Sequence, residues 1–486
     1  MKKTGVNPFL PSWEYIPDGE PHVFNDTDGN PRVYLYGSHD KFNGYAYCMN
    51  DYVCWSAPEN DLTDWRYEGI IYRKTDDPQN KDGSMHLYAP DVTRGQDGKF
   101  YLYYVLDKLD VISVAVCSAP CGKYEFLGYV HYPCGTLLGR KEDDVPQFDP
   151  AVFTEGSKTY LYSGQCTGNG KTVEDYRNHS IAVVLGSDML TIQEGPFPVI
   201  PGINASEGTG FEGHEFFEAS SIRKKDDTWY FIYSAYSMNE LCYATSKHPL
   251  KDFKYGGVIV SNADLNIDAY KPAKKQMYFS NNNHGSIAQI AGSWYIFYHR
   301  HTNGNEFSRQ ACLEPIKFNK DGSINQVEMT SSGPNGAPLP CFGEYGAYIA
   351  CNIFSLDEIA PPLKTYWPNR NPEMPFITQD ECDSYDTKKN YENGFITNII
   401  DNRAVGFKYF DCKGVTKIAV KIRGYCRGFF EVRIKWDGEP LGKIDVVSSN
   451  IWKYFSSDIS IPDGIRSLYF IYRGTGIGTL GSFKLS

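Results

Sequence analysis

The sequence lacks any apolar run that approaches the length of a membrane span, and its first residues, MKKTGVNPFLPSWEY, contain no apolar core of a secretory signal. It also lacks clusters of basic residues. The formal net charge is −11, which makes nucleic acids and anionic membranes poor partners. These absences predict a cytoplasmic protein that binds neither nucleic acid nor membrane, and the sequence shows no sign of an obligate protein partner.

A disulfide framework is also missing. The 13 cysteines are an odd number scattered through 486 residues, which is typical of free, mostly buried thiols in a reducing compartment. Cys117 and Cys121 lie close together in the sequence, but no pair of His or Cys residues is near them. A zinc site is therefore not expected at these two cysteines.

Aromatic residues are abundant, at 15% of the chain, and they recur in a pattern. Five strand-like runs share it: RVYLYGSHD from Arg32, KFYLYYVLD from Lys99, KTYLYSGQC from Lys158, TWYFIYSAY from Thr228 and SWYIFYHRH from Ser293. The runs are roughly 60–70 residues apart, and most follow a turn sequence, as the second strands of hairpins do. This spacing predicts an all-β chain with a five-bladed β-propeller, and it fits a β-sandwich of ordinary hairpins less well.

Polar residues lie about ten residues before the aromatic runs, on the strand that precedes each hairpin. One such acid alone is usually a turn cap or a buried group satisfied by backbone amides. Because the innermost strands of a propeller converge on its axis, we expect these residues to form a ring, which is costly to bury unless function retains it. The members of the ring are Asp18 and Glu20, Asp91, Asp149, Glu218 and His284.

Paired carboxyl groups meet the chemical requirement for glycoside hydrolysis. One must be protonated to assist the leaving group, and the other must be ionised to activate water. A third carboxylate raises the pKa of the acid through like-charge repulsion. Metal-assisted hydrolysis would require more than the one His found at this position of the repeat, His284.

Six motifs together resemble glycoside hydrolase family 43: NPFLP, PDGEP, YAPDV, FDPAVF, FFEASSIRK and NHGSIAQ, spread over residues 7–310. The resemblance implies a five-bladed propeller and an inverting enzyme that acts on arabinose and xylose linkages. It implies that Glu218 is the general acid and that Asp149 tunes the pKa of this acid and orients substrate. By the same resemblance His284 helps to hold a calcium ion or its waters near the axis, and Arg300 contacts the sugar. Asp91 is similar to a motif residue usually regarded as structural, and we also count it among the substrate-site candidates.

The general base has two candidates. The chain reads Asp18-Gly19-Glu20-Pro21, whereas the family usually has a single Asp followed by Pro. Alignment from Pro21 favours Glu20, while the preference of the family for Asp favours Asp18. We favour Asp18 as the base, with Glu20 orienting the substrate or capping the strand.

Other residues are expected near the substrate: four flank these motifs or end the first aromatic run, and Trp55 lies in VCWSAP. For the aromatic residues among them, core packing is the commoner role. These additional substrate-site candidates are His39, Asp40, Trp55, Phe148 and Phe217. The DTDGN loop, residues 26–30, is expected to be a hairpin turn rather than a calcium loop, because the remaining calcium ligands are absent.

The domain prediction assigns residues 1–360 to the catalytic propeller, 361–376 to a Pro-rich linker or domain edge, and 377–486 to a β-sandwich. The motifs AVGFKYFD and FIYRGTGIGTLGSFKL resemble carbohydrate-binding family 6 modules. Those modules usually carry an Asn and exposed aromatic residues where this chain has Leu480, Gly481 and Ser482. The sandwich is therefore expected either to bind sugar or only to pack against the propeller.

The resemblance implies an inverting exo-hydrolase that releases α-L-arabinofuranosyl or β-D-xylosyl units from arabinoxylan- or arabinan-derived oligosaccharides. The PDGEPHVF form of the first motif favours the arabinofuranosidase activity. The chemistry requires no cofactor, and a structural calcium near the axis is expected. The irregular base motif keeps an alternative open, a non-catalytic sugar-binding propeller with an appended sandwich.

Overall fold

The computed structural model describes residues 4–165, 178–357, 373–380 and 394–486. Within these ranges almost all regular structure is β-strand. Helix is limited there to four short 3₁₀ turns: η1 (Lys74–Asp76), η2 (Pro78–Asn80), η3 (Gly333–Asn335) and η4 (Ala347–Ile349). None of the helices in the described ranges has the length and apolar character that a membrane crossing requires.

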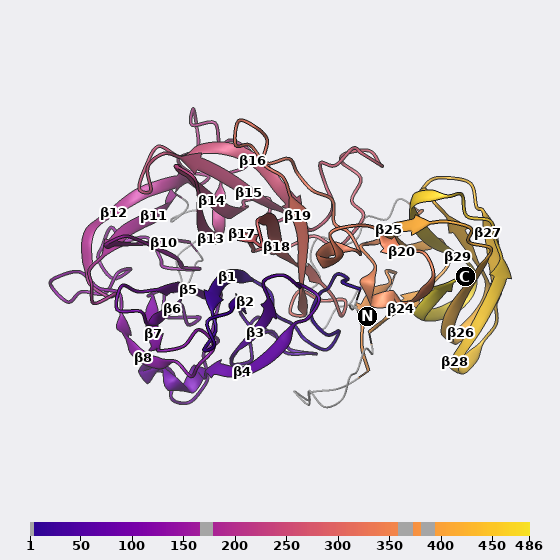
Figure 1. Cartoon of the computed structure of the whole chain (residues 1–486), viewed down its shortest axis with the longest axis horizontal. Coiled ribbons are helices and arrows are strands. Elements are labelled where there is room, and N and C mark those ends of the chain that lie inside the picture. Colours follow the sequence, from indigo (N-terminus) through magenta and orange to yellow (C-terminus); the bar gives the residue numbers. More distant parts are fainter. Residues whose placement is uncertain (1–3, 166–177, 358–372, 381–393) are drawn as a thin grey trace.

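Five antiparallel sheets form the blades of a propeller (Figure 1). The innermost strands β1, β5, β9, β13 and β17 contact one another in that order, and β17 contacts β1, which closes the ring. Blade one contains β1 (Glu20–Asn25), β2 (Pro31–Tyr36), β3 (Tyr52–Pro58) and β4 (Arg66–Tyr72); blade two contains β5 (Asp91–Arg94), β6 (Phe100–Tyr104), β7 (Ser113–Cys117) and β8 (Glu125–Tyr129). Blade three contains β9 (Ala151–Glu155), β10 (Lys158–Ser163), β11 (His179–Leu185) and β12 (Ile192–Pro201); blade four contains β13 (Phe216–Lys225), β14 (Thr228–Ala235), β15 (Glu240–Ser246) and β16 (Lys254–Ser261); blade five contains β17 (Ser286–Ile290), β18 (Ser293–His301) and β19 (Arg309–Ile316).

The predicted propeller is confirmed, and the five aromatic runs form the second strands of the blades, β2, β6, β10, β14 and β18. Successive side chains of a strand point to opposite faces, so a strand buried on both faces reads as a continuous apolar run. In β2, Val33 and Leu35 pack in the cluster shared with blade five. Tyr34 and Tyr36 pack in the cluster shared with blade two. The aromatic runs are therefore the layers that join neighbouring blades.

The C-terminal sheet has ten strands and curls beside the propeller (Figure 1). Strand β26 pairs with β28 along its first half and with β27 along its second half, which suits the predicted sandwich. The strands are β20 (Leu339–Pro340), β21 (Gly343–Gly346), β22 (Asn352–Ser355), β23 (Phe376–Thr378), β24 (Phe395–Ile399), β25 (Arg403–Cys412), β26 (Lys417–Arg433), β27 (Gly442–Val446), β28 (Ser449–Asp458) and β29 (Gly464–Leu485).

The predicted boundary at residue 360 is too late, because β20, β21 and β22 already pair with strands of the C-terminal sheet. Most of the predicted linker 361–376 lies outside the described residues, and its last residues lead into β23. Leu480 is fully buried, and a side chain added at Gly481 would meet the ring of Trp452 at 2.9 Å. Ser482 Oγ donates to Glu344 Oε1 at 2.5 Å. These three positions therefore serve packing within the sheet.

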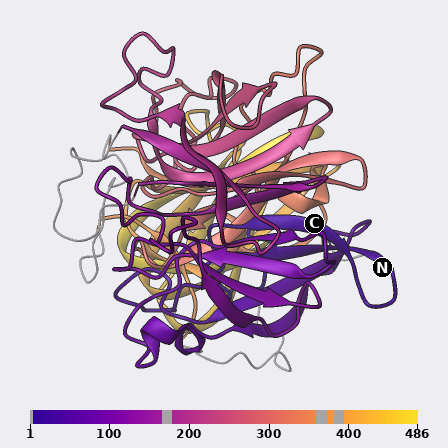
Figure 2. The same cartoon turned by 90° about the vertical axis from the view of Figure 1, so that its left-hand side faces the viewer.

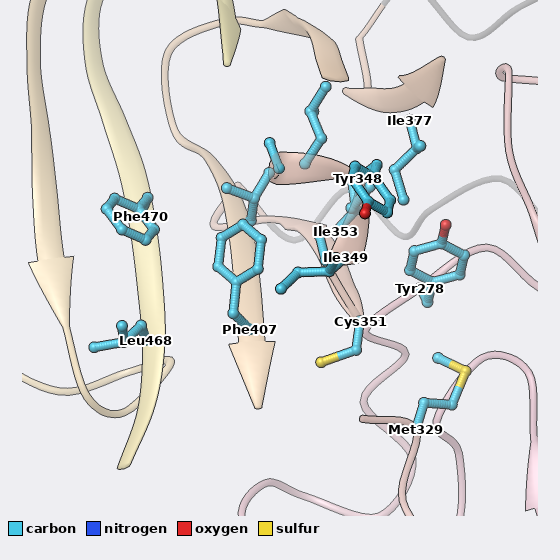
Figure 3. Packing of buried hydrophobic residues seen from close by; sticks show 14 of the residues in the cluster. Tyr278, Met329, Tyr348, Ile349, Cys351, Ile353, Ile377, Phe407, Leu468 and Phe470 are labelled. Carbon is cyan, nitrogen blue, oxygen red and sulfur yellow. The ribbon is translucent and has the colours of Figure 1, made fainter. Parts of the chain in front are cut away.

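The two domains share a continuous apolar core. It runs from blades four and five into the C-terminal sheet, which lies behind the blades when the molecule is viewed from the propeller side (Figure 2). Figure 3 shows its central part, where Tyr278 and Met329 of the propeller side approach Phe407 and Phe470 of the sheet through the segment that carries η4. Such shared burial makes independent movement of the two domains costly.

Candidate active site

Three acids of the predicted ring stand at one end of the inner strands. Asp18 precedes β1, Asp149 precedes β9, and Glu218 lies in β13. The backbone is left-handed at or beside all three positions, with φ of 58° at Asp18, 43° at Asp149 and 68° at Ala219. Non-glycine residues rarely adopt this conformation, which costs free energy and tends to occur at functional sites. The recurrence at three acids from different blades points to a common function for them.

These acids line a single cavity of about 210 Å³. Of the residues expected near the substrate or axis, Phe148, Phe217 and His284 also line it. The rings of Phe148 and Tyr88 pack in a T-shaped arrangement, with centroids 5.3 Å apart and planes at 85°. The cavity therefore combines acidic groups with aromatic walls, a combination that suits a sugar ring better than an anionic ligand.

Asp18 is held ionised. Arg309 Nη1 donates to Asp18 Oδ1 at 3.0 Å, and the hydroxyl of Ser38 donates to Asp18 Oδ2. Burial by itself would raise the pKa of Asp18, but the positive charges of Arg309 and His284 outweigh burial and lower it below the ordinary value. Asp18 is therefore a carboxylate over a wide pH range, as a general base must be.

Glu218 has the opposite environment. Burial, followed by the negative charges of Asp149 and Asp18, raises the pKa of Glu218 well above its ordinary value. Asn282 Nδ2 donates to Glu218 Oε1 at 3.2 Å, a contact that a neutral carboxyl group also accepts. Glu218 is therefore suited to carry a proton near neutral pH, as a general acid must.

Asp149 links the acid to the axis. Its Oδ2 accepts the backbone N–H of Ala219 at 3.1 Å, so it is fixed beside the residue that follows Glu218. His284 Nδ1 lies 3.5 Å from the same oxygen. Burial would lower the pKa of His284, but Asp149 raises it to about 9, so His284 carries positive charge at neutral pH.

The neutral imidazole of His299 supports Asp18. Burial, with a further contribution from Arg309, lowers the pKa of His299 to about 3. The backbone N–H of Asp18 donates to His299 Nδ1 at 3.4 Å, and His299 Nε2 donates to the carbonyl of Asn282 at 3.0 Å. The imidazole therefore fixes the backbone of the base and the residue that contacts the acid.

Glu20, the other candidate for the base, does not line the cavity. Its Oε2 accepts a hydrogen bond from Arg223 Nη2 at 2.5 Å near the axis. Burial raises the pKa of Glu20 to about 7 despite this neighbour. Because the backbone at Asp18 is left-handed, the side chains of Asp18 and Glu20 point in different directions. Asp18 lines the cavity, whereas Glu20 contacts Arg223.

The axial groups can be tested as ligands for the expected calcium ion. Glu20 Oε1 is buried without a hydrogen-bond partner among the described residues, and His284 Nε2 lies 4.0 Å from it. Both oxygens of Asp91 are already used, by His22 Nε2 at 2.7 Å and by the backbone N–H of Val152 at 2.8 Å. Calcium takes six to eight oxygen ligands. Among the axial groups in the described ranges, Glu20 therefore offers one free carboxylate oxygen, which fits a cation that keeps most of its water.

Several predicted substrate-site residues lie behind the cavity rather than in its lining. His39 Nε2 and Trp55 Nε1 contact Glu14 at 3.0 Å and 2.8 Å, which keeps both rings in the core of blade one. Asp91 is buried in the axial hydrogen bonds, and Asp40 binds Arg309. Their polar atoms are satisfied by the protein, so they support the site without facing it.

The expected sugar contact of Arg300 does not match its position. Arg300 is completely buried, and its guanidinium donates to the carbonyl of Ala350 at 3.2 Å and to Tyr298 Oη at 3.1 Å. The arginine that lines the cavity is Arg309, at the start of the next strand, β19. Arg300, in β18, also donates to the carbonyl of Thr330, so its charge serves contacts within the protein.

Sequence reasoning missed several residues of the cavity: Tyr47, Cys48, Tyr88, Met238, Asn282 and Arg309. Asn282 could have been found, because it stands two residues before His284 in the NNNHGS motif. Tyr47 lies outside the repeat, and its ring packs 4.7 Å from the guanidinium of Arg309. Tyr88 opens the YAPDV motif and could also have been found. No position of the repeat marks Tyr47, because the loop between β2 and β3 brings it to the cavity.

The chain is also similar to known proteins. The model of glycosyl hydrolases family 43 matches residues 20–324. A xylosidase/arabinosidase of Thermoclostridium stercorarium is 62% identical over 486 residues, covering 100% of this chain and 99% of that protein. An arabinoxylan arabinofuranohydrolase of Paenibacillus polymyxa is 23% identical over 98% of this chain and 72% of its own length.

Two solved structures share the fold. A family 43 arabinoxylan arabinofuranohydrolase from Bacillus subtilis, in complex with cellotetraose, matches 99% of this chain and 97% of its own, with a TM-score of 0.50 and 20% identity. A family 43 β-xylosidase/α-arabinofuranosidase from a compost metagenome, in complex with xylotriose and in a calcium-free form, matches 67% and 98%, with a TM-score of 0.51 and 24% identity. From the family match and the relative that is similar over the full length, the chain belongs to the glycosyl hydrolases of family 43.

Proposed function

We propose that this glycosidase releases α-L-arabinofuranosyl or β-D-xylosyl units from arabinoxylan- or arabinan-derived oligosaccharides, with inversion at the anomeric carbon. One observation carries the catalytic assignment. Asp18 and Glu218 line the same cavity, and their surroundings move their pKa values in opposite directions. Two carboxyl groups in opposite protonation states are what acid and base catalysis of glycoside hydrolysis requires.

In the proposed reaction Asp18 accepts a proton from a water molecule as its oxygen attacks the anomeric carbon. Glu218 donates its proton to the glycosidic oxygen as the bond from that oxygen to the anomeric carbon breaks. The products are a sugar of inverted configuration and the shortened oligosaccharide. Asp18 is then protonated and Glu218 ionised, and proton exchange with solvent restores the starting state.

Asp149 acts through Glu218 in this proposal. Its negative charge is the largest contribution, after burial, to the raised pKa of Glu218. The bond from the N–H of Ala219 to Asp149 fixes the backbone beside the acid at the same time. Asp149 is thus a positioning and tuning residue, and Asn282 holds Glu218 from the other side.

The choice of substrate rests on the cavity and on the relatives. A cavity of about 210 Å³ suits a single sugar ring better than an extended chain, which favours removal of terminal units. Phe148 and Phe217 offer apolar surface for the ring. The relative at 62% identity is described as a xylosidase/arabinosidase, and the PDGEPHVF motif favours arabinofuranoside as the better substrate.

Calcium near the axis is a finer proposal. Glu20 Oε1 would be its protein ligand, and His284 would contact one of its waters. The ion would supply positive charge that stabilises the buried acids around the axis. The reaction itself needs only the carboxyl groups and water.

The experiment is hydrolysis of 4-nitrophenyl α-L-arabinofuranoside and β-D-xyloside by the wild type and by Asp18→Asn, Glu218→Gln and Glu20→Gln. Loss of the base or the acid lowers kcat by about 10²–10⁴-fold. Glu20→Gln is the matched control, because it changes a buried acid two residues from Asp18 that does not line the cavity. The anomer first released, followed by NMR, reports inversion or retention.

The outcomes separate the assignments. Full activity of Glu218→Gln contradicts its role as acid, and loss of turnover in Glu20→Gln with retention in Asp18→Asn moves the base to Glu20. Release of the retained anomer contradicts the inverting mechanism. The alternative of a non-catalytic sugar-binding propeller requires that the wild type bind oligosaccharides without cleaving them.

A cytoplasmic location remains our proposal. The cysteines in the described ranges are free thiols, and most of them are buried. Buried free thiols are typical of reducing compartments. Fractionation of the source cells followed by immunodetection checks it, and enzyme found outside the cells contradicts it.

A further inference from the structure

Three side chains of the types that bind transition metals meet in blade four, away from the catalytic cavity. They are His214, in the turn before β13, and Glu240 and Cys242, which are alternate residues of β15 and therefore share a face of the blade. His214 Nδ1 lies 2.9 Å from Glu240 Oε2 and 3.9 Å from Cys242 Sγ. One ligand atom from each residue lies within 4.8 Å of the other two.

These separations are close to those that one bound ion imposes. With metal–nitrogen and metal–oxygen bonds of about 2.0–2.2 Å and a metal–sulfur bond of about 2.3 Å, tetrahedral ligands stand roughly 3.3–3.7 Å apart. His214 Nδ1 and Glu240 Oε2 would separate slightly, and Nδ1 and Cys242 Sγ would approach slightly. Changes of this size need only small adjustments of side-chain torsions.

Neighbouring groups already orient two of the three ligands, Glu240 and His214. Asn266 Nδ2 donates to Glu240 Oε1, which leaves Oε2 facing His214. The ring of Tyr255 stacks on the imidazole of His214, with centroids 4.7 Å apart and planes at 13°. Supporting contacts of this kind orient the side chains that coordinate a metal and raise the affinity of the site for the metal.

We propose that His214, Glu240 and Cys242 form a binding site for zinc, with a water molecule in the fourth position. A thiolate and an imidazole select zinc over calcium or magnesium, which prefer all-oxygen ligands. The side chain of His214 is 31% exposed, which gives the ion a path from solvent and leaves room for the water. Binding replaces the proton on Cys242 Sγ, which is released to solvent, so uptake strengthens as pH rises.

The site would act on the strand that carries the acid. His214 stands just before Phe217 and Glu218, and its carbonyl accepts the hydroxyl of Tyr233 at 2.7 Å. An ion bound by His214 and by two residues of β15 would link the segment before β13 to the second hairpin of blade four. None of the three ligands lines the catalytic cavity, so the inference does not depend on the proposed hydrolysis.

The experiment measures zinc and Co²⁺ binding by the full chain after treatment with a chelator. The wild type is compared with His214→Gln and Cys242→Ser, and with Cys134→Ser as a matched control because Cys134 is exposed and lies between β8 and β9, outside blade four. We expect the wild type and the Cys134 variant to bind one zinc ion per chain with equal affinity. The His214 and Cys242 variants should bind zinc at least ten-fold more weakly. Co²⁺ should give a thiolate charge-transfer band that Cys242→Ser lacks.

Two outcomes overturn the inference: equal zinc stoichiometry and affinity in the wild type and in His214→Gln, or a Co²⁺ spectrum without thiolate character. Cys242 is buried, so its variant could fold poorly, whereas His214 is partly exposed and its variant keeps the test valid. Matching thermal unfolding midpoints of the chelator-treated proteins establish that the folds compared are the same.

Discussion

Arg309 contacts Asp18 and Asp40 with one guanidinium group. Its Nη1 donates to Asp18 Oδ1 at 3.0 Å, and its Nε donates to Asp40 Oδ2 at 2.8 Å. Asp40 therefore fixes the position of the positive charge that keeps Asp18 ionised. The arrangement joins blade five to blade one across the closure of the ring, so closing the propeller also sets up the proposed base.

Arg309→Lys should lower kcat by about ten-fold or more, because a point charge cannot serve both carboxylates as the planar guanidinium does. The matched change is Arg300→Lys, which alters a completely buried arginine outside the cavity. We expect that variant to lower the thermal unfolding midpoint while kcat of the folded enzyme changes little. Steady-state kinetics and calorimetry on both variants check this, and full kcat in Arg309→Lys would contradict it.

The ring of acids and the propeller could be predicted from the sequence because both are local and repeated. A strand buried on two faces reads as an apolar run, and Asp149 and Glu218 occupy equivalent places relative to such runs. Arg309 could not be predicted in this way. It begins the last strand of blade five and meets Asp18 only because the ring closes. Contacts of that kind depend on the whole fold.

The choice between Asp18 and Glu20 shows the same limit on a smaller scale. Regular alternation along an extended strand would put residues 18 and 20 on one side. The left-handed backbone at Asp18, with φ of 58°, breaks that alternation and leaves Glu20 beside Arg223. The domain boundary was misplaced for a related reason, because the pairing of β22 with β25 joins segments that are far apart in the chain.

Asp149→Asn should move the alkaline limb of the pH profile of kcat/KM to lower pH. Asp149 raises the pKa of Glu218 through its negative charge, so its removal lowers that pKa, and the acid loses its proton at lower pH. Asp188→Asn, at an exposed acid of blade three, is the control and should leave the profile unchanged. An alkaline limb that stays in place would show that Asp149 does not tune Glu218.

Glu218→Gln should be more stable than the wild type, by a margin that grows with pH. Burial and the negative charge of Asp149 hold the folded pKa of Glu218 well above its ordinary value, so the stability that its protonated form contributes is lost as pH rises from the unfolded pKa to the folded one. Glutamine has the same shape and does not titrate. Thermal unfolding midpoints of both proteins across pH check this, and a difference that does not change with pH would contradict it.

Lys408→Met should destabilise the junction between the two domains. Lys408 belongs to β25, is completely buried, and places Nζ 2.9 Å from Asp264 Oδ2 and 3.2 Å from Glu328 Oε2 in the propeller. Removing one partner leaves the carboxylate of Asp264 buried without its cation, at a cost of about 3–5 kcal/mol in the free energy of unfolding. The double variant with Asp264→Asn should recover part of this loss, because the charge that lacked a partner is gone. Denaturant unfolding of the wild type and the single and double variants measures the coupling, and strictly additive effects would show that the two side chains do not stabilise the junction as a pair.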